Sequence, residues 1–309
     1  MKRSVKPDPL KPGDSVAIAA PGSHLTREGR EYLRRAVSTL EGLGFHMKAT
    51  PDPFRKDHYL AGGDRERADE LMALFADPDI RAIFCARGGY GSQRIIPFLD
   101  PDVIQRNPKI FVGSSDITAL LVYLLEVCHL IPFHGPNVAT KQFLEGASHR
   151  TQASLRETLN RGIPGEIPLC KSLRTGIGRG KIKGGCLSLL VTTIGTDYEM
   201  DLGGVILFVE DFNEPVYRID RMLTHMRQAG KLERLEGVIF GEMVDCQRGQ
   251  GVDLETVILN LFHDQDIPIV IGFPSGHGRT NLTIPLGVEV TLDGSCGRVI
   301  FNENGLAIP

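Results

Sequence analysis

The chain has 309 residues, of which 41% are hydrophobic and 24% charged, and its formal net charge is −3. These values are typical of a globular protein with two domains of ordinary size, and they give no support to a disordered chain, a nucleic-acid surface or a membrane surface. The six cysteines form no C-x-x-C pair, and no apolar run is long enough for a signal peptide or a membrane span. We therefore expect a cytoplasmic protein with reduced cysteines.

Strand and helix patterns alternate through the first half of the chain. The predicted strands are residues 14–20, 45–50, 80–86 and 109–113, and the predicted helices are residues 26–43, 64–76 and 116–128. In the first helix, Leu33, Ala36, Val37 and Leu40 recur at the spacing of one helical face. This alternation predicts βαβ units with a mainly parallel sheet, in which ligand sites form beyond the carboxyl ends of the strands.

The pattern changes after about residue 145. A helix is expected near residues 151–160, and a glycine-rich stretch follows that carries five basic residues and no acid between Lys171 and Lys183. These residues are interpreted as an inter-domain connection, whose charges are either solvated or face an anionic substrate. Further strands are predicted at residues 205–210, 237–241, 267–272 and 288–292, with helices near 217–229 and 254–263 and a hairpin around Asp293-Gly294.

The predicted fold class is therefore α/β with two domains. Residues 1–145 are expected to form a flavodoxin- or Rossmann-like three-layer domain with a mainly parallel sheet. Residues 146–178 are expected to be a linker. Residues 179–309 are expected to form a smaller C-terminal α/β domain with mixed and antiparallel strands.

The segment KIFVGSSDITAL, residues 109–120, places two hydroxyls and a carboxylate at a corner between a predicted strand and a predicted helix. Ser115 would be exposed at the carboxyl edge of the sheet, where amides at the start of the helix can stabilise an oxyanion. The corner is analogous to a nucleophile elbow, although the pattern G-x-S-x-G is absent. Capping of the helix by Ser114, Ser115 or Asp116 explains the same residues equally simply.

The segment CARGGYGSQR, residues 85–94, also follows a predicted buried strand. Its paired glycines would allow backbone N–H groups to approach a ligand closely. The segment matches neither the dinucleotide fingerprint nor the Walker A motif. It is therefore compatible with a phosphate-binding loop or with an ordinary turn.

Two further segments carry groups that could activate a serine. The apolar strand VILFVE ends in Glu210, followed by Asp211, and a carboxylate there needs a partner unless it faces solvent. His277 lies between two glycines in a loop after another strand, and no His or carboxylate cluster has metal-binding spacing. A serine nucleophile requires an imidazole base, which in turn requires a carboxylate to orient it. Ser115, Glu210 and His277 would fill these roles if the two domains face each other.

The chain resembles the LD-carboxypeptidase family, serine peptidases that trim murein peptides inside bacteria. The likeness covers nearly the whole chain through the segments VAIAAPGS, YLAGGDRERADEL, IRAIFCARGGYGSQRIIPFLD, KIFVGSSDITALL, FHGP, GGCLSLL, LFVEDFNEPVYRIDRML and GHGRTNLTIPLG. It implies that the catalytic serine, glutamate and histidine are Ser115, Glu210 and His277. It also implies an oxyanion hole made by the backbone amide of Asp116 and one from Gly88 or Gly89.

The resemblance implies hydrolysis of the bond before the terminal D-alanine of a cytoplasmic murein tetrapeptide, through an acyl-enzyme. No metal or organic cofactor and no nucleic-acid or membrane partner is implied, and a homodimer is suggested. The substrate carboxylate requires a cation, and the candidates are Arg87, Arg179, Lys181 and Lys183. One departure is Cys186, which stands where the family usually has asparagine and leaves the polar contact expected there open.

Two alternatives remain beside this prediction. A sister branch of the family cleaves microcin-type peptidyl nucleotides and stacks the base on an aromatic residue of an extra loop, commonly tryptophan. This chain has no tryptophan, and the interval between Ser115 and Glu210 looks too short for such a loop, which favours the murein peptide. The other alternative is a two-domain binding protein without catalysis, which would have no reason to keep all three triad residues.

Overall fold

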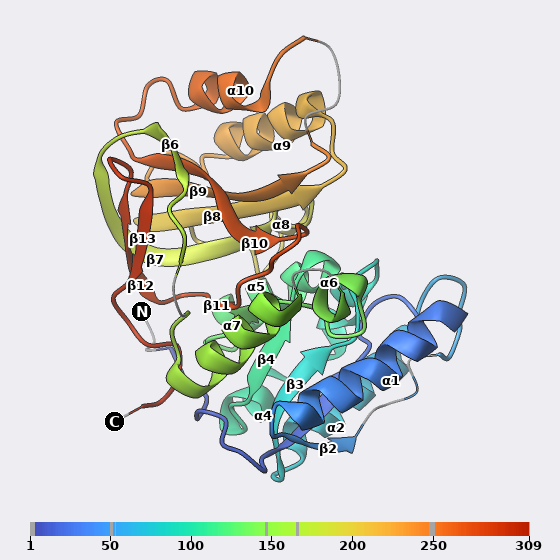
Figure 1. Ribbon diagram of the computed structural model, residues 1–309. Helices are drawn as coiled ribbons and strands as arrows, with labels where there is room; N and C mark the ends of the chain where they lie inside the picture. The colour runs from blue at the N-terminus through green and yellow to red at the C-terminus, as the bar shows by residue number, and fades with distance from the viewer. Residues whose placement is uncertain are drawn as a thin grey trace.

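The first half of the chain folds around a six-stranded sheet, as the computed structural model shows for residues 4–49, 52, 54–145, 148–164, 167–246 and 251–308 (Figure 1). The strand order is β11-β5-β4-β3-β1-β2, and all neighbours are parallel except β11, which is antiparallel to β5. The strands are β1 (Ser15–Ala19), β2 (His46–Ala49), β3 (Ile80–Cys85), β4 (Ile110–Gly113), β5 (Phe133–His134) and β11 (Ile284–Pro285). This order is that of a flavodoxin-like domain, with its switch point between β1 and β3.

The helices of this half follow the predicted pattern closely. They are α1 (Arg27–Gly42), α2 (Asp64–Ala76), α3 (Ser92–Ile95), α4 (Pro101–Arg106), α5 (Thr118–Glu126), α6 (Lys141–Leu144) and α7 (Ser148–Arg161), with 3₁₀ turns η1 (Ile96–Phe98) and η2 (Ser115–Ile117). The α2 helix has the predicted bounds, and α1 begins after Thr26, whose hydroxyl accepts from the amide of Gly29 at 3.2 Å. The α5 helix begins two residues later than predicted because η2 occupies the corner.

The second half folds around a seven-stranded mixed sheet in the order β13-β12-β7-β8-β9-β10-β6. The strands are β6 (Lys171–Arg174), β7 (Ile177–Cys186), β8 (Val205–Phe212), β9 (Gly237–Val244), β10 (Ile269–Gly276), β12 (Glu289–Asp293) and β13 (Arg298–Phe301). The helices are α8 (Leu187–Thr193), α9 (Val216–Gln228) and α10 (Leu254–Leu261). The β7 to β10 strands are parallel, and β6, β12 and β13 run antiparallel to their neighbours. The fold class predicted from the sequence is confirmed.

The two sheets share one apolar core. Buried Phe111 of the first sheet and buried Phe208 and Phe273 of the second belong to the same cluster of packed hydrophobic side chains. The β11 strand, which follows β10 along the chain, returns to pair with β5 in the first sheet. These contacts hold the two halves against each other along one boundary, with the second sheet above the first domain in Figure 1.

The segment interpreted as a linker is more structured than the sequence indicates. The helix expected near residues 151–160 is present as α7, and residues 171–174, for which no strand was predicted, form β6, which pairs with β10 as an edge strand of the second sheet. The sequence did not indicate this strand, because the segment is rich in glycine and has no strong periodicity. The β6 strand instead depends on pairing with a partner almost 100 residues further along the chain. The predicted limits of the two domains stay a prediction.

Candidate active site

The corner after β4 presents Ser115 in an unusual backbone conformation. Ser115 has a φ of 64°, in the left-handed region that non-glycine residues rarely adopt, and its side chain is partly exposed. Ser114 is buried and its backbone is held by Asn137, which donates to its carbonyl at 3.1 Å. Within the part of the chain that the structure describes, η2 and α5 both begin without a side-chain capping bond. The capping explanation therefore fails, and the sharp turn resembles a nucleophile elbow.

The loop after β3 lies directly against this corner. A Cβ atom on Gly88 would lie 2.8 Å from Ser115 Cβ, 3.0 Å from its Oγ and 3.2 Å from the backbone nitrogen of Asp116. The buried carboxylate of Asp116 accepts from the amides of Gly91 at 3.2 Å and Ser92 at 2.8 Å. Burial raises the pKa of this carboxyl, and the bonds from Ser92 and Gly91 oppose that rise. Asp116 thus fixes the glycine loop beside the serine, and the close approach leaves no room for a side chain at Gly88.

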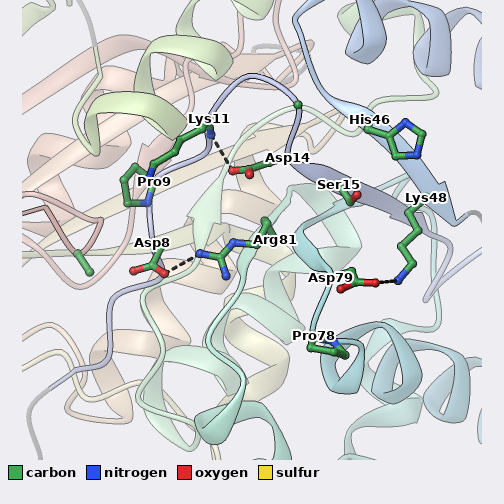
Figure 2. A pocket seen from close by; sticks show the side chains of 12 residues that line it. Asp8, Pro9, Lys11, Asp14, Ser15, His46, Lys48, Pro78, Asp79 and Arg81 are labelled. Carbon is green, nitrogen blue, oxygen red and sulfur yellow. Dashed lines mark hydrogen bonds and ion pairs between the residues drawn. The ribbon is translucent and has the colours of Figure 1, made fainter.

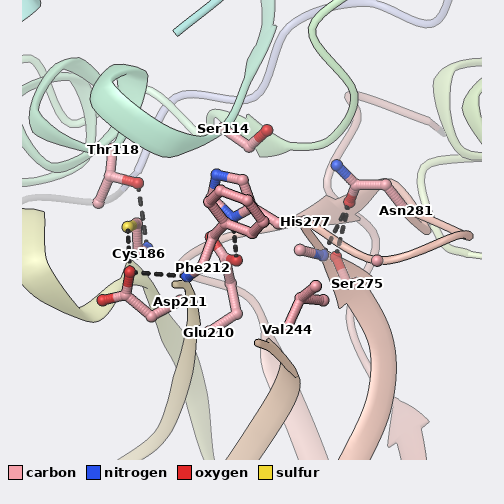
Figure 3. Close-up of polar contacts among 12 residues, drawn as sticks. Ser114, Thr118, Cys186, Glu210, Asp211, Phe212, Val244, Ser275, His277 and Asn281 are labelled. Atoms are coloured by element: carbon pink, nitrogen blue, oxygen red, sulfur yellow. Dashed lines mark hydrogen bonds and ion pairs between the residues drawn. The ribbon is translucent and has the colours of Figure 1, made fainter. Parts of the chain in front are cut away.

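The carboxyl ends of the second sheet supply an acid and an imidazole. Glu210 ends the apolar part of β8 and is fully buried, and its Oε2 lies 2.6 Å from His277 Nδ1 (Figure 3). In Figure 3 the imidazole lies between Glu210 and Ser114, the neighbour of Ser115. Within the described ranges no hydrogen bond joins Ser115 to His277. Two of the three predicted triad residues, Glu210 and His277, are therefore in direct contact, and Ser115 lies on the domain that faces them.

The surroundings of His277 favour its charged form. Burial by itself lowers the pKa of the imidazole, but the hydrogen bond and the charge of Glu210, with a smaller contribution from Asp211, outweigh it and raise the pKa above its usual value. The ring of Phe212 stacks on the imidazole with centroids 5.6 Å apart and planes 22° apart. Phe212 is 48% exposed, so one side of this pair faces solvent.

Asp211, the acid next to Glu210, has a different role. It accepts from the backbone amides of Ser188 and Phe212, each at 2.8 Å, and Cys186 Sγ lies 3.6 Å away. Burial, together with the charges of Glu210 and Asp211, raises the pKa of the Cys186 thiol well above its usual value. The backbone amide of Cys186 donates to Thr118 Oγ1 at 3.1 Å, a contact between the two halves that does not depend on the side chain at this position.

His134 is a site neighbour that the sequence analysis missed. His134 is the last residue of β5, the strand next to β4 in the first sheet. It is fully buried, and its ring lies edge-on to that of Phe208 with the centroids 5.1 Å apart. Within the described part of the chain, neither of its ring nitrogens has a hydrogen-bond partner. Burial and the nearby charge of His277 lower its pKa to about 3, so His134 is neutral at ordinary pH. His134 stands in the FHGP segment that carries part of the family likeness, but the sequence analysis assigned it no role.

The four predicted carboxylate-binding cations lie in different places. Arg87 is partly exposed, directly precedes Gly88, and donates to the carbonyl of His24 at 3.2 Å. Lys183 forms an ion pair with Glu126 at 2.7 Å and is 13% exposed. Arg179 and Lys181 lie in the first half of β7, on the order of 20 Å along an extended strand from its end at the site. These positions make Arg87 the best placed of the four.

A hollow of about 940 Å³ lies at the opposite end of the first sheet, at the amino ends of β1, β2 and β3 (Figure 2). Its charges are paired with one another, Arg81 with Asp8 at 2.6 Å and Lys48 with Asp79 at 2.8 Å. No triad residue lines it. Over the described ranges, no group of three or more His, Cys, Asp or Glu side chains is arranged to hold a metal ion, and no helix has the length and apolar character to cross a bilayer.

Comparisons with known proteins agree with the two-domain α/β fold. Residues 16–135 match the LD-carboxypeptidase N-terminal domain, and residues 179–292 match the LD-carboxypeptidase C-terminal domain. A probable murein peptide carboxypeptidase of Bacillus subtilis (strain 168) is 34% identical over 93% of this chain and 91% of its own length.

Two solved structures extend the comparison. The crystal structure of muramoyltetrapeptide carboxypeptidase from Oxalobacter formigenes has a TM-score of 0.84 at 28% identity and covers 92% of this chain and 97% of its own. The structure of the microcin immunity protein MccF in complex with glutamyl sulfamoyl guanosine has a TM-score of 0.91 at 26% identity, over 98% and 99% of the two chains. With both family domains matched and a relative more than 30% identical over nearly its whole length, this chain belongs to the LD-carboxypeptidase family.

Proposed function

We propose that this protein is a serine carboxypeptidase that removes the terminal D-alanine from murein tetrapeptides in the cytoplasm. The observation that carries the proposal is the 2.6 Å contact between His277 Nδ1 and Glu210 Oε2, at the face where β4 presents Ser115. A buried carboxylate on Nδ1 holds the tautomer that leaves Nε2 free to accept a proton. The same reaction is supported by relatives that are named murein peptide, murein tetrapeptide or muramoyltetrapeptide carboxypeptidases.

In the proposed reaction, His277 takes the proton of Ser115 as its Oγ attacks the carbonyl of the diamino acid residue. Glu210 stabilises the imidazolium that results. The oxyanion forms at the space beside Gly88, where the backbone amide of Asp116 and an amide of Gly88 or Gly89 would donate to it. His277 then protonates the leaving amine of D-alanine, and a water molecule activated by the same imidazole resolves the acyl-enzyme.

Arg87 is proposed to bind the carboxylate of the terminal D-alanine. Arg87 directly precedes Gly88 in the chain, and its Nε lies 3.8 Å from a Cβ built on Gly89. Among the residues described, its guanidinium donates to the carbonyl of His24 and has no carboxylate partner. A guanidinium with free N–H groups matches a carboxylate in two-bond geometry. Arg179, Lys181 and Lys183 were predicted for the same role, but Lys183 is already paired and the other two lie far along β7.

The test is incubation of the purified protein with a murein tetrapeptide, with detection of tripeptide and free D-alanine. Ser115→Ala should lower kcat by on the order of 10⁴-fold or more while the unfolding temperature stays close to that of the wild type. Ser114→Ala is the matched control and should retain activity, because Ser114 is buried beside Asn137. If the Ser115 variant keeps most of its activity, the nucleophile is another residue.

The second candidate is hydrolysis of a peptidyl nucleotide, and the TM-score of 0.91 with the microcin immunity protein favours testing it. An aspartyl- or glutamyl-adenylate analogue in the same assay separates the two substrates. We also propose a homodimer, which sedimentation of the purified protein would test. No release of D-alanine from any tetrapeptide, even at high enzyme concentration, would leave a binding protein as the better description.

A further inference from the structure

The loop that carries His277 is held by a residue of the other domain. Gln142 belongs to the short α6 helix of the first half, and its side-chain nitrogen donates to the carbonyl of Gly276 at 2.7 Å and to the carbonyl of Gly278 at 2.6 Å. These two carbonyls belong to the residues on either side of His277. A primary amide has two N–H donors, so both are used on the backbone that flanks the imidazole.

Asn281 closes the same contact from inside the loop. Its Oδ1 accepts from the amide of Gly276 at 3.2 Å, and its Nδ2 donates to Gln142 Oε1 at 3.4 Å. Its own backbone amide donates to Thr151 Oγ1 of the α7 helix at 3.1 Å. Four hydrogen bonds therefore attach the loop to the α6 and α7 helices, in the half of the chain that carries the serine.

The segment that supplies Gln142 is also attached to the serine corner. Asn137, five residues earlier, donates to the backbone carbonyl of Ser114 at 3.1 Å. The amides of Val138 and Ala139 donate to the carbonyls of Cys85 and Ala86 at the end of β3, at 2.9 and 2.8 Å. One short stretch of chain thus contacts the nucleophile corner at one end and the histidine loop at the other.

The loop needs this support because its own backbone is permissive. Gly276 has a φ of 125°, which only glycine adopts readily, and Gly278 follows the histidine. The bond to Glu210 fixes His277 relative to the second sheet only. Transfer of a proton from Ser115 requires the imidazole to be placed relative to the first sheet as well, within a few tenths of an ångström.

We propose that Gln142 is a positioning residue that sets the place of His277 relative to Ser115 across the domain boundary. This inference rests on the proposed function of the triad. Because Gln142 would act on the base and not on the substrate, its loss should lower kcat and leave KM nearly unchanged.

The experiment compares two Gln142 variants with a matched control. Gln142→Met keeps the length of the side chain and removes both donors, and it should lower kcat by about 10- to 100-fold with KM changed by less than about twofold. Gln142→Glu keeps the shape but places a carboxylate against two carbonyls, so its loss of kcat should be at least as large. Gln152→Met is the control, since Gln152 donates to the carbonyl of Phe143 at 2.7 Å and does not touch the loop.

A spectroscopic readout separates this inference from the proposed function. The downfield proton resonance of His277 Nδ1–H, bound to Glu210, should shift or broaden in Gln142→Met and stay unchanged in Gln152→Met, whatever the substrate. Unfolding temperatures of all variants check that they are folded. Wild-type kcat and an unchanged His277 resonance in folded Gln142→Met would overturn the proposal. An inactive wild type would overturn the proposed function instead, and the resonance would still decide the role of Gln142.

Discussion

At the scale of single residues, the pair Glu210–His277 determines how activity depends on pH. His277 must be neutral to accept a proton, and its pKa is raised, so kcat/KM should rise with pH along a limb centred above the usual value of 6.5. Glu210→Gln removes the charge, which should move the limb to lower pH and lower kcat by on the order of 10³- to 10⁴-fold. Asp211→Asn should cost at most about tenfold, because the asparagine oxygen can still accept from Ser188. If Asp211→Asn lowers kcat more than Glu210→Gln does, Asp211 and not Glu210 is the acid that orients His277.

The residue types of the site could be predicted from the sequence, whereas its supporting contacts could not. Ser115 and His277 stand in short segments whose glycines and corner positions are readable without a structure. Helix capping by Ser114, Ser115 or Asp116 was one interpretation of the corner, whereas the Asp116 carboxylate accepts from amides of the loop after β3. Gln142 carries no local signal, and the FHGP segment gave no role to His134, because both residues act on groups more than 100 positions away. Only the folded chain brings those groups into contact.

At the scale of elements, the loop after β3 offers a test of the oxyanion space. Gly88 has an ordinary φ, so alanine fits its backbone, but the added Cβ would lie 2.8 Å from Ser115 Cβ and 3.2 Å from the amide of Asp116. Gly88→Ala should therefore lower kcat/KM by on the order of 10²-fold, since it occupies the space needed by the reacting oxygen. Gly63→Ala is the control because nothing lies within 4 Å of its added Cβ. Equal activity in the two variants would place the oxyanion elsewhere.

Elements with their own periodicity were predicted well, and elements that depend on distant partners were not. The α2 helix, with an apolar face and acids in its first turn, has the expected bounds. The β11 strand has two residues and forms only because Ile284 and Pro285 meet β5. The β6 strand likewise requires β10. Short edge strands of this kind carry no pattern long enough to predict.

At the scale of the whole molecule, the boundary between the two halves is both the site and part of the core. Phe208 of the second sheet packs against His134 of the first, and Lys183 of β7 pairs with Glu126 of α5 while both are mostly buried. Such contacts oppose hinge opening, because separating the halves would expose apolar surface and an ion pair that is now shielded from water. One cluster of buried hydrophobic residues thus spans both sheets, and each half also has a cluster largely of its own.

This shared core should make global stability depend on pH through His134. Its pKa is lowered to about 3 in the folded protein, so between the usual value of 6.5 and about 3 the unfolded chain binds a proton that the folded chain does not. The stability that neutral His134 contributes is present above pH 6.5 and is lost as the pH falls, by about 2 kcal/mol between pH 7 and pH 5.

Urea unfolding of the wild type and of His134→Phe at both pH values measures this contribution. The effect of the substitution on packing is the same at both pH values, so it cancels when the two losses of stability are compared. The variant should lose about 2 kcal/mol less on acidification, whereas His149→Gln, on the exposed side of α7, should behave as the wild type. Equal losses in wild type and His134→Phe would mean that His134 accepts a proton without unfolding.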